Sequence, residues 1–470
     1  MAFQVSPGVL VQERDLTRII PAVSTSIGAV AGQFTKGPLD EIISISSEQE
    51  LVDTFGKPDV NNFEYFFSAA NFLQYSNSLR VVRATQKSTL NASTSGTGVL
   101  LKNTDDWTNN YASGGQAGNA TFVARSAGAH GNTLQVSVCA NAAAYEEEGA
   151  TTVNDASTAV GDTTITAAAG ANLNVGDIIA FSTTAATNDY DDGEQYRITN
   201  ISTNDITIVQ HPRGTGGLKR ALTDGSNIRR RWKYYDAVDG APGTSTYVSE
   251  RNGANDEIHV VVIDEDGGIS GVPGTILETF SKLSKASDAK DPQGNDNYYP
   301  NVIYTKSQYI YWTKHHASGS NWGNAASGTT FTAVNDPTLE TMSGGSNGSA
   351  VTTGQIKTAY DKFADSETVD ISLIISGPCD STHIENMISI AEARKDCVVF
   401  ASPERSDVVN VTNSNTQKSN VVSFFSTISS TSYASFDSGY KYMYDRYNDV
   451  YRFVPLNGDM AGLCARTDLI

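Results

Sequence analysis

The chain has 470 residues, and its 33 lysines and arginines against 52 aspartates and glutamates give a net charge of −19. A chain this acidic repels nucleic acid and anionic membranes, which excludes both as general partners. The N-terminus, "MAFQVSPGVLVQERD", lacks the cationic start and apolar core of a secretory signal. No apolar run approaches the ~18 residues that a bilayer-spanning helix needs.

The length predicts about three domains. A hydrophobic content of 39% and 40 glycines are typical of β-rich, loop-rich domains. The four cysteines have no CxxC spacing, which favours free buried thiols in a reducing compartment over disulfides or metal ligands. We therefore expect a water-soluble protein made in a cytoplasm.

Residues 1–22 are predicted to form an extended arm. In "SPGVLVQERD", Val9 and Val11 share one face of an extended segment, and Leu10 lies on the opposite face. The segment is too short to bury itself, and Pro21 separates it from the following residues. We hypothesise that Val5–Asp15 is a donated strand that pairs with the sheet of a neighbouring molecule.

Residues 23–92 have an α/β pattern. "STSIGAVAGQF" (24–34) and "SLRVVRA" (78–84) are predicted strands, and "NFEYFFSAANFLQY" (62–75) is a predicted helix. "SSEQELVDTFG" (46–56) predicts a helix with Ser46 or Ser47 as N-cap, a capping box between Ser47 and Glu50, and Gly56 at its end.

Residues 150–218 change to a composition rich in Thr, Ala, Asn and Asp, with turn signals about every 8–12 residues. Short strands are predicted at 163–168, 176–181, 195–202 and 204–209, which suggests an inserted antiparallel β-barrel or sandwich. Outside this segment, strands are predicted at 132–140, 233–238 ("KYYDAV") and 257–268. "TILETFSKLSKAS" (275–287) is a predicted helix.

The C-terminal part alternates helices with buried strands. Helices are predicted at 353–365 and 382–394, and near-continuous apolar strands at "VDISLIISGP" (369–378) and "CVVFASP" (397–403). This β-α-β order predicts a parallel sheet between about 354 and 456. The fold class is therefore α+β multi-domain: an α/β core sheet with helices plus an inserted antiparallel β-barrel or sandwich module. The predicted domains are an arm (1–22), a discontinuous α/β middle domain (23–149 with 219–345), an inserted β-rich outer domain (150–218) and an α/β core domain (346–470).

No motif supports catalysis, a cofactor or a metal. "GGSNG" (344–348) fits G-x-S-x-G with Ser346, but no apolar strand precedes it and no helix directly follows. "NDYDDGE" (188–194) and "VIDEDGG" (262–268) fail the calcium-loop pattern, and "RGTGGLKR" (213–220) fails the phosphate-loop patterns. The adjacent His315 and His316 cannot share a helix face as ligands. "RRRWKYY" (229–235) favours a solvated strand edge or a protein contact over single-strand nucleic-acid binding.

Three stretches resemble one family. "SPGVLVQERD", "GKPDVNNFEYFFSAANFLQYSNSLRVVRA" and "YKYMYDRYNDVYRFVPLNGDMAGLCARTD" are similar, in that order, to contractile phage tail sheath proteins, above all those of T-even-like myoviruses. The residues carried over for a self-assembly arm are Ser6, Pro7, Gly8, Val9, Val11 and Glu13. Those carried over as the family's core motif are Tyr444, Pro455, Gly458, Asp459, Ala461, Gly462, Arg466 and Asp468.

The resemblance implies a structural protomer that polymerises as a helical sleeve around the tail tube and contracts to drive the tube through the host envelope. The implied partners are further copies of the chain, the tail tube protein, and baseplate and tail terminator proteins. The implied location is the virion, after synthesis in the host bacterial cytoplasm. The alternative is a β-rich phage fibre or adhesin, which shares the Gly/Thr-rich modules but does not explain the two buried strands at 369–378 and 397–403.

The last segment, "NGDMAGLCARTDLI" (457–470), predicts the start of a helix capped by Asn457 or Asp459. Leu463 and the aliphatic face of the Met460–Ala465 turn are expected to pack on the core sheet, because buried parallel strands need cover on both faces. In the family this helix leads into a further C-terminal domain. The resemblance therefore implies a chain that lacks that domain, and we expect this form to be a monomer.

Overall fold

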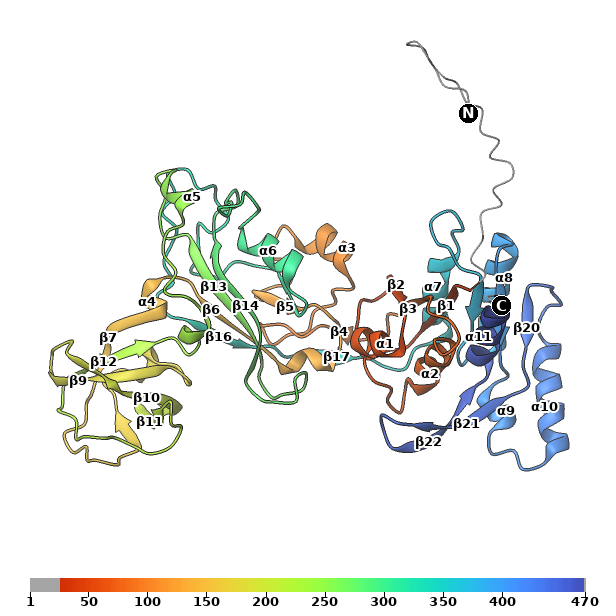
Figure 1. Cartoon of the computed structure of the whole chain (residues 1–470), viewed down its shortest axis with the longest axis horizontal. Helices are drawn as coiled ribbons and strands as arrows, with labels where there is room; N and C mark the ends of the chain where they lie inside the picture. The colour runs from red at the N-terminus through yellow and green to blue at the C-terminus, as the bar shows by residue number, and fades with distance from the viewer. Residues whose placement is uncertain (1–25, 469–470) are drawn as a thin grey trace, which may run out of the picture. The chain divides into compact units, whose positions relative to one another are not determined.

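The structure, a computed structural model, describes residues 26–468, which fall into two compact units (Figure 1). Unit 1 contains the described residues up to Phe34, Asp40–Thr85 and the residues from Ala350 onward; unit 2 contains Thr35–Leu39 and Gln86–Ser349. This division differs from the expected one, in which residues 23–149 share a middle domain with 219–345. Most of residues 26–85 lie instead with the C-terminal segment, because their strands pair with its strands.

Unit 1 is built on a six-stranded sheet with the order β2-β3-β1-β18-β19-β20. Its strands are β1 (Gly28–Gly32), β2 (Ile42–Ile45), β3 (Leu79–Arg83), β18 (Leu373–Ile375), β19 (Val398–Ala401) and β20 (Ala434–Phe436). β1 pairs in parallel with β3 and β18, and the parallel pairing continues through β19 to β20; β2 alone runs antiparallel. The predicted parallel sheet is confirmed, but both ends of the chain contribute to it.

Helices cover both faces of this sheet. They are α1 (Glu48–Phe55), α2 (Phe63–Phe72), α7 (Thr353–Tyr360), α8 (Ser381–Arg394), α9 (Arg405–Val408), α10 (Ser414–Ser426) and α11 (Asn457–Asp468). Because side chains alternate along a strand, Val30 of β1 packs in the cluster that contains residues of α1, α2 and α11, whereas Ala29 packs with those of α7 and α8. A separate hairpin consists of β21 (Tyr440–Asp445) and β22 (Val450–Pro455).

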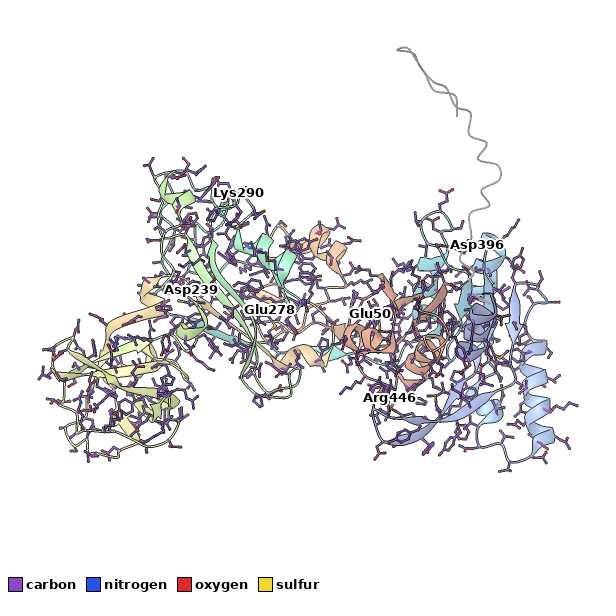
Figure 2. The ribbon with its side chains drawn as sticks, in the orientation of Figure 1. Glu50, Asp239, Glu278, Lys290, Asp396 and Arg446 are labelled. Carbon is purple, nitrogen blue, oxygen red and sulfur yellow. The ribbon has the colours of Figure 1, made fainter. Side chains whose placement is uncertain are left out.

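The ends of α1 follow from local sequence. The Ser47 hydroxyl accepts a hydrogen bond from the Glu50 backbone N–H over 3.2 Å, and Gly56 ends the helix at a φ of 87°. The Glu50 carboxylate (Figure 2) accepts from the backbone N–H of Ser46, not of Ser47. The predicted N-cap is therefore confirmed at Ser47, while the reciprocal half of the capping box lies one residue earlier than expected.

Unit 2 contains a four-stranded sheet with the order β14-β13-β6-β16. Its strands are β6 (Leu134–Cys139), β13 (Glu257–Asp264), β14 (Thr275–Ser284) and β16 (Thr338–Thr341); β5 (Phe122–Ala124) pairs with β15 (Ile310–Trp312), and β4 (Thr89–Leu90) with β17 (Ser346–Asn347). The helices are α3 (Thr104–Asp106), α4 (Ala142–Tyr145), α5 (Thr246–Ser249) and α6 (Tyr299–Lys306).

Two predicted elements of unit 2 are wrong. The helix expected at 275–287 is strand β14, which pairs antiparallel with β13 through two register shifts. Antiparallel pairing with the preceding strand β13, most of whose residues are buried, overrides the helical spacing of its apolar residues. The strand expected at 233–238 is instead a turn that contains a short 3-10 helix at Tyr235–Ala237.

Residues 146–231, here called the β-module, form a six-stranded antiparallel sheet with the order β7-β12-β9-β10-β11-β8. Its strands are β7 (Glu146–Thr152), β8 (Thr164–Thr166), β9 (Ile178–Ala185), β10 (Tyr190–Ser202), β11 (Asp205–His211) and β12 (Ser226–Arg231). The sheet thus extends beyond the expected bounds of 150–218. One isolated bridge joins Val153 to Ala167 beside the two edge strands, without a continuous ladder that would close a barrel.

Across the part of the chain that the structure covers, no helix has both the length and the apolar character needed to cross a membrane.

Candidate assembly surface

Only one of the two predicted sets of site residues lies within the part of the chain that the structure describes. The arm residues Ser6, Pro7, Gly8, Val9, Val11 and Glu13 lie outside the described residues. The motif residues lie in unit 1: Tyr444 is on β21, Pro455 ends β22, and Gly458, Asp459, Ala461, Gly462, Arg466 and Asp468 are on α11. The structure therefore gathers most of the motif on one helix.

The small residues of α11 let it pack closely against α2 and the residues after it. A Cβ at Gly458 would overlap the backbone carbonyl of Ser68, and one at Gly462 would lie 2.5 Å from the ring of Tyr75. Ala461 and Ala465 are fully buried in the same contact. Leu463 is 46% exposed, so the prediction that it packs on the sheet is wrong, whereas the predicted packing of the Met460–Ala465 turn is confirmed at its two alanines. Small residues, not Leu463, form the buried face of α11.

Asn457, which the sequence suggested only as a helix cap, anchors α11 to the sheet. Its side chain is fully buried, and its amide Nδ2 lies 3.1 Å from Ser376 Oγ, 2.9 Å from the Gly377 carbonyl and 3.0 Å from Ser402 Oγ. Ser376 and Ser402 directly follow β18 and β19. The start of α11 is thus fixed to the carboxyl ends of two central strands, which sequence spacing alone could not show.

A hydrogen-bonded carboxyl cluster continues from this anchor. Ser402 Oγ donates to Asp437 over 2.7 Å, and burial raises the pKa of Asp437 to about 6. Lys441 Nζ donates to Asp459 Oδ1 over 2.7 Å, which ties α11 to β21. The motif residue Asp459 therefore has a positioning role between the helix and the hairpin.

The hairpin has one packed face and one exposed aromatic face. On the packed face, Met443 and Val454 belong to the core cluster that contains α2. The exposed face carries Tyr442, Tyr444, Tyr451 and Phe453, whose neighbouring ring centroids lie 4.7–5.3 Å apart. Tyr442 and Tyr451 are each 61% exposed. At its turn, Arg446 (Figure 2) pairs with Glu48 of α1 over 2.6 Å, which holds the hairpin in place.

Exposed apolar side chains are concentrated around this hairpin. More than half of the large exposed apolar residues within 26–468 lie between 422 and 463: Val422, Phe436, Tyr442, Tyr444, Val450, Tyr451, Met460 and Leu463. Helix α10 has no buried residue, and a groove of about 480 Å³ lined by Val421 of α10 and by Tyr440 and Phe453 of the hairpin lies between them. Among the described residues, no third strand pairs with the hairpin (Figure 1). We call the eight exposed side chains named above the apolar surface.

The sequence candidates for chemistry have structural roles. Ser346 lies on β17, which pairs with β4, and the next helix, α7, begins only at Thr353. Asp264, in "VIDEDGG", accepts hydrogen bonds from Thr133, Ile269 and Ser270, which hold its pKa below the ordinary range. Within residues 26–468, no group of His, Cys, Asp and Glu side chains is arranged to hold a metal ion.

His315 is enclosed by tyrosines. Its ring nitrogens contact the hydroxyls of Tyr299 at 2.6 Å and Tyr298 at 3.2 Å, and burial lowers the pKa of His315 to about 4. The imidazole is therefore neutral at physiological pH and serves as a hydrogen-bonding member of an aromatic cluster.

The cations of "RRRWKYY" are not on a solvated strand edge, which corrects that expectation. Arg229 and Arg230 are buried, and each has carboxylate partners. Arg229 pairs with Asp192 of the acidic segment "NDYDDGE", at the start of β10, and lies over the ring of Tyr190. Two sequence features that were read separately are therefore one ion-paired cluster.

Sequence comparisons relate this chain to one family of known proteins. A family model described as the domain III N-terminal region of tail sheath protein Gp18 matches residues 25–84. The tail sheath protein of Enterobacteria phage T4 is 30% identical, over 98% of this chain and 72% of the relative. That of Vibrio phage KVP40 is 27% identical, over 99% of this chain and 74% of the relative. The crystal structure of sheath tail protein Lin1278 from Listeria innocua has a TM-score of 0.41 and 9% identity, over 94% of this chain but only 56% of that one.

Proposed function

The chain belongs to the phage tail sheath protein family, and from that premise we propose that the full-length protein polymerises, in many copies, as a helical sleeve around a tail tube. The sleeve contracts and drives the tube through the host envelope. The protein is made in the host cytoplasm and acts in the virion. It has a structural role and performs no catalysis.

The observation that carries this proposal is the apolar surface of unit 1. Single exposed apolar side chains are ordinary, but a contiguous aromatic face beside a groove marks a protein contact. A two-stranded hairpin also leaves strand edges that can accept a further strand. Both features suit repeated contacts between protomers.

The arm supplies the complementary half of such a contact. Val5–Asp15 alternates as a strand does, and we propose that it adds to a sheet edge of a neighbouring protomer. The proposed further partners are the tail tube protein and the baseplate and tail terminator proteins. The net charge of −19 makes nucleic acid an unfavourable partner.

We propose that the β-module lies away from the contacts that the apolar surface makes. Its strands form their own core and its loops are rich in exposed polar residues, which suits a module on the outer surface of the sleeve. Its curled sheet is proposed to be barrel-like. Neither the position of the module on the outer surface nor its barrel-like shape is needed for polymerisation.

The test is electron microscopy of phage tails that carry changes in the apolar surface. Changing Tyr442→Ser and Tyr451→Ser together should give naked or partly covered tubes, because the aromatic face is lost while the inner face of the hairpin is unchanged. Val272→Ser removes a similarly exposed apolar side chain (62%) from unit 2 and should give normal sheaths. Normal sheaths in the double variant would show that the exposed face of the hairpin is not a contact between protomers. Wild-type tails in which antibodies to this chain label no sheath would overturn the function itself.

A further inference from the structure

Arg230 occupies a completely buried position where the β-module meets the rest of unit 2. It lies near the end of β12, the last strand of the module, and its side chain has no exposed surface. A buried guanidinium needs hydrogen-bond acceptors around it to offset its desolvation.

Five acceptors meet this guanidinium, and they come from both sides of the junction. Within the β-module, the Asn172 carbonyl lies at 3.1 Å and Glu147 Oε2 at 2.9 Å. Outside the module, the Ala143 carbonyl lies at 3.2 Å, the Asn335 carbonyl at 3.0 Å and Asp336 Oδ1 at 2.8 Å. One side chain therefore joins the module to α4 and to the loop that precedes β16.

Trp232 adds a second anchor two residues later. Its indole Nε1 donates to Ser137 Oγ on β6 over 2.8 Å, and its ring stacks on His259 of β13 with centroids 6.2 Å apart. It is 1% exposed and packs with Cys139 and Val261. The segment that leaves the module is thus buried on the face of the central sheet, unlike an exposed, flexible linker.

Rotation of the module would break this arrangement. It would separate Arg230 either from Glu147 and Asn172 or from Asn335 and Asp336, and the buried guanidinium would lose those hydrogen bonds. The planar guanidinium also fixes the direction of each bond, whereas an ammonium would not. The cost of a buried cation without its partners opposes any hinge at this place.

We infer that Arg230 and Trp232 form a clamp that makes the β-module and the central sheet of unit 2 one rigid body. The module is therefore not a tethered domain that reorients on its own, and a force applied to the module reaches β6 and β13 directly. This inference rests on unit 2 alone and is independent of the proposed sheath function.

The first experiment uses the wild-type protein. Residual dipolar couplings should give one common alignment tensor for the amides of the β-module and for those of β6, β13 and β14. Tensors of clearly different magnitude for the two groups would show independent motion and overturn the clamp. This measurement needs no variant and is unaffected by any folding defect.

The second experiment changes the clamp. Arg230→Lys keeps the charge but cannot reach acceptors on both sides, and Trp232→Phe keeps a ring but loses the bond to Ser137. Each variant should be cleaved faster by chymotrypsin at the junction, next to Tyr145 or Tyr234, because local opening becomes more frequent. For Arg230→Lys the increase in rate should be on the order of tenfold.

The matched control is Arg220→Lys. Arg220 bonds to Glu194 and to the carbonyls of Phe181 and Ser182, all within the β-module. The Arg220→Lys variant should be cleaved at the junction at a rate within about twofold of the wild-type rate, because it loses no contact across the junction. Equal cleavage rates for Arg230→Lys and Arg220→Lys would contradict the inference.

Discussion

Lys441 donates a hydrogen bond to Asp459 over 2.7 Å and thereby joins the hairpin to α11. The pair is mostly buried, with side-chain exposures of 28% for Lys441 and 13% for Asp459, and the second carboxylate oxygen has no hydrogen-bond partner. The pair therefore determines how the exposed aromatic face is held against the rest of unit 1.

Removing one partner of this pair should be worse than removing both charges. Lys441→Met leaves a half-buried carboxylate unpaired and should lower the free energy of unfolding by about 1–3 kcal/mol. Adding Asp459→Asn should recover part of that loss. Urea unfolding of the two single variants and the double variant gives the coupling energy; additive effects would mean that the pair contributes no net interaction.

Close packing at Gly458 makes it intolerant of any side chain. Gly458→Ala places a methyl group against the Ser68 carbonyl and should destabilise unit 1 by about 1–3 kcal/mol. Gly354→Ala in α7 is the matched control, because its Cβ meets no atom within 4 Å. That change should be neutral or stabilise by up to about 1 kcal/mol. Equal urea midpoints for the two variants would mean that α11 does not need its close approach.

Asp177 of the β-module should make stability depend on pH. Burial raises the pKa of Asp177 to about 7, so the folded state binds its proton more tightly than the unfolded state. Its contribution to stability is then fully present below about pH 4 and is lost as the pH rises through 7.

The isosteric Asp177→Asn variant does not lose this contribution to stability as the pH rises. Its stability relative to wild type should rise between pH 4 and pH 8, by about 2–4 kcal/mol, and then level off. Urea unfolding of both proteins at several pH values measures the difference, in which the titrations of all other groups cancel. A difference that does not change with pH would show that the pKa of Asp177 is the same in the folded and unfolded states and would contradict the prediction.

Deleting residues 1–20 tests the arm. Sheath formation on phage tails should be abolished, because a donated strand has no substitute. Unit 1 and unit 2 should remain folded, with circular dichroism and thermal unfolding close to wild type. Complete sheaths from the deletion variant would refute the donated strand, whereas loss of folding would show that the arm belongs to a core.

Several features follow from sequence because their causes are local. Ser47 and Gly56 bound α1 through a cap and a left-handed turn, and both can be identified in eleven residues of sequence. The apolar strands β18 and β19 and the helix α8 between them have the expected positions, because continuous burial leaves a simple pattern. The resemblance of residues 440–468 to the family also needed no structure.

The tertiary structure decided what depends on partners outside each segment. β14 has helical spacing in its sequence, and antiparallel pairing with the preceding strand β13 makes it a strand. The cations Arg229 and Arg230 look solvated in sequence, and they are buried because carboxylates from other segments meet them. Leu463 is exposed while Ala461 is buried, because the closest approach of α2 selects small residues. Local sequence carries caps and periodicity, but pairing, ion partners and close packing are properties of chain segments brought together by folding.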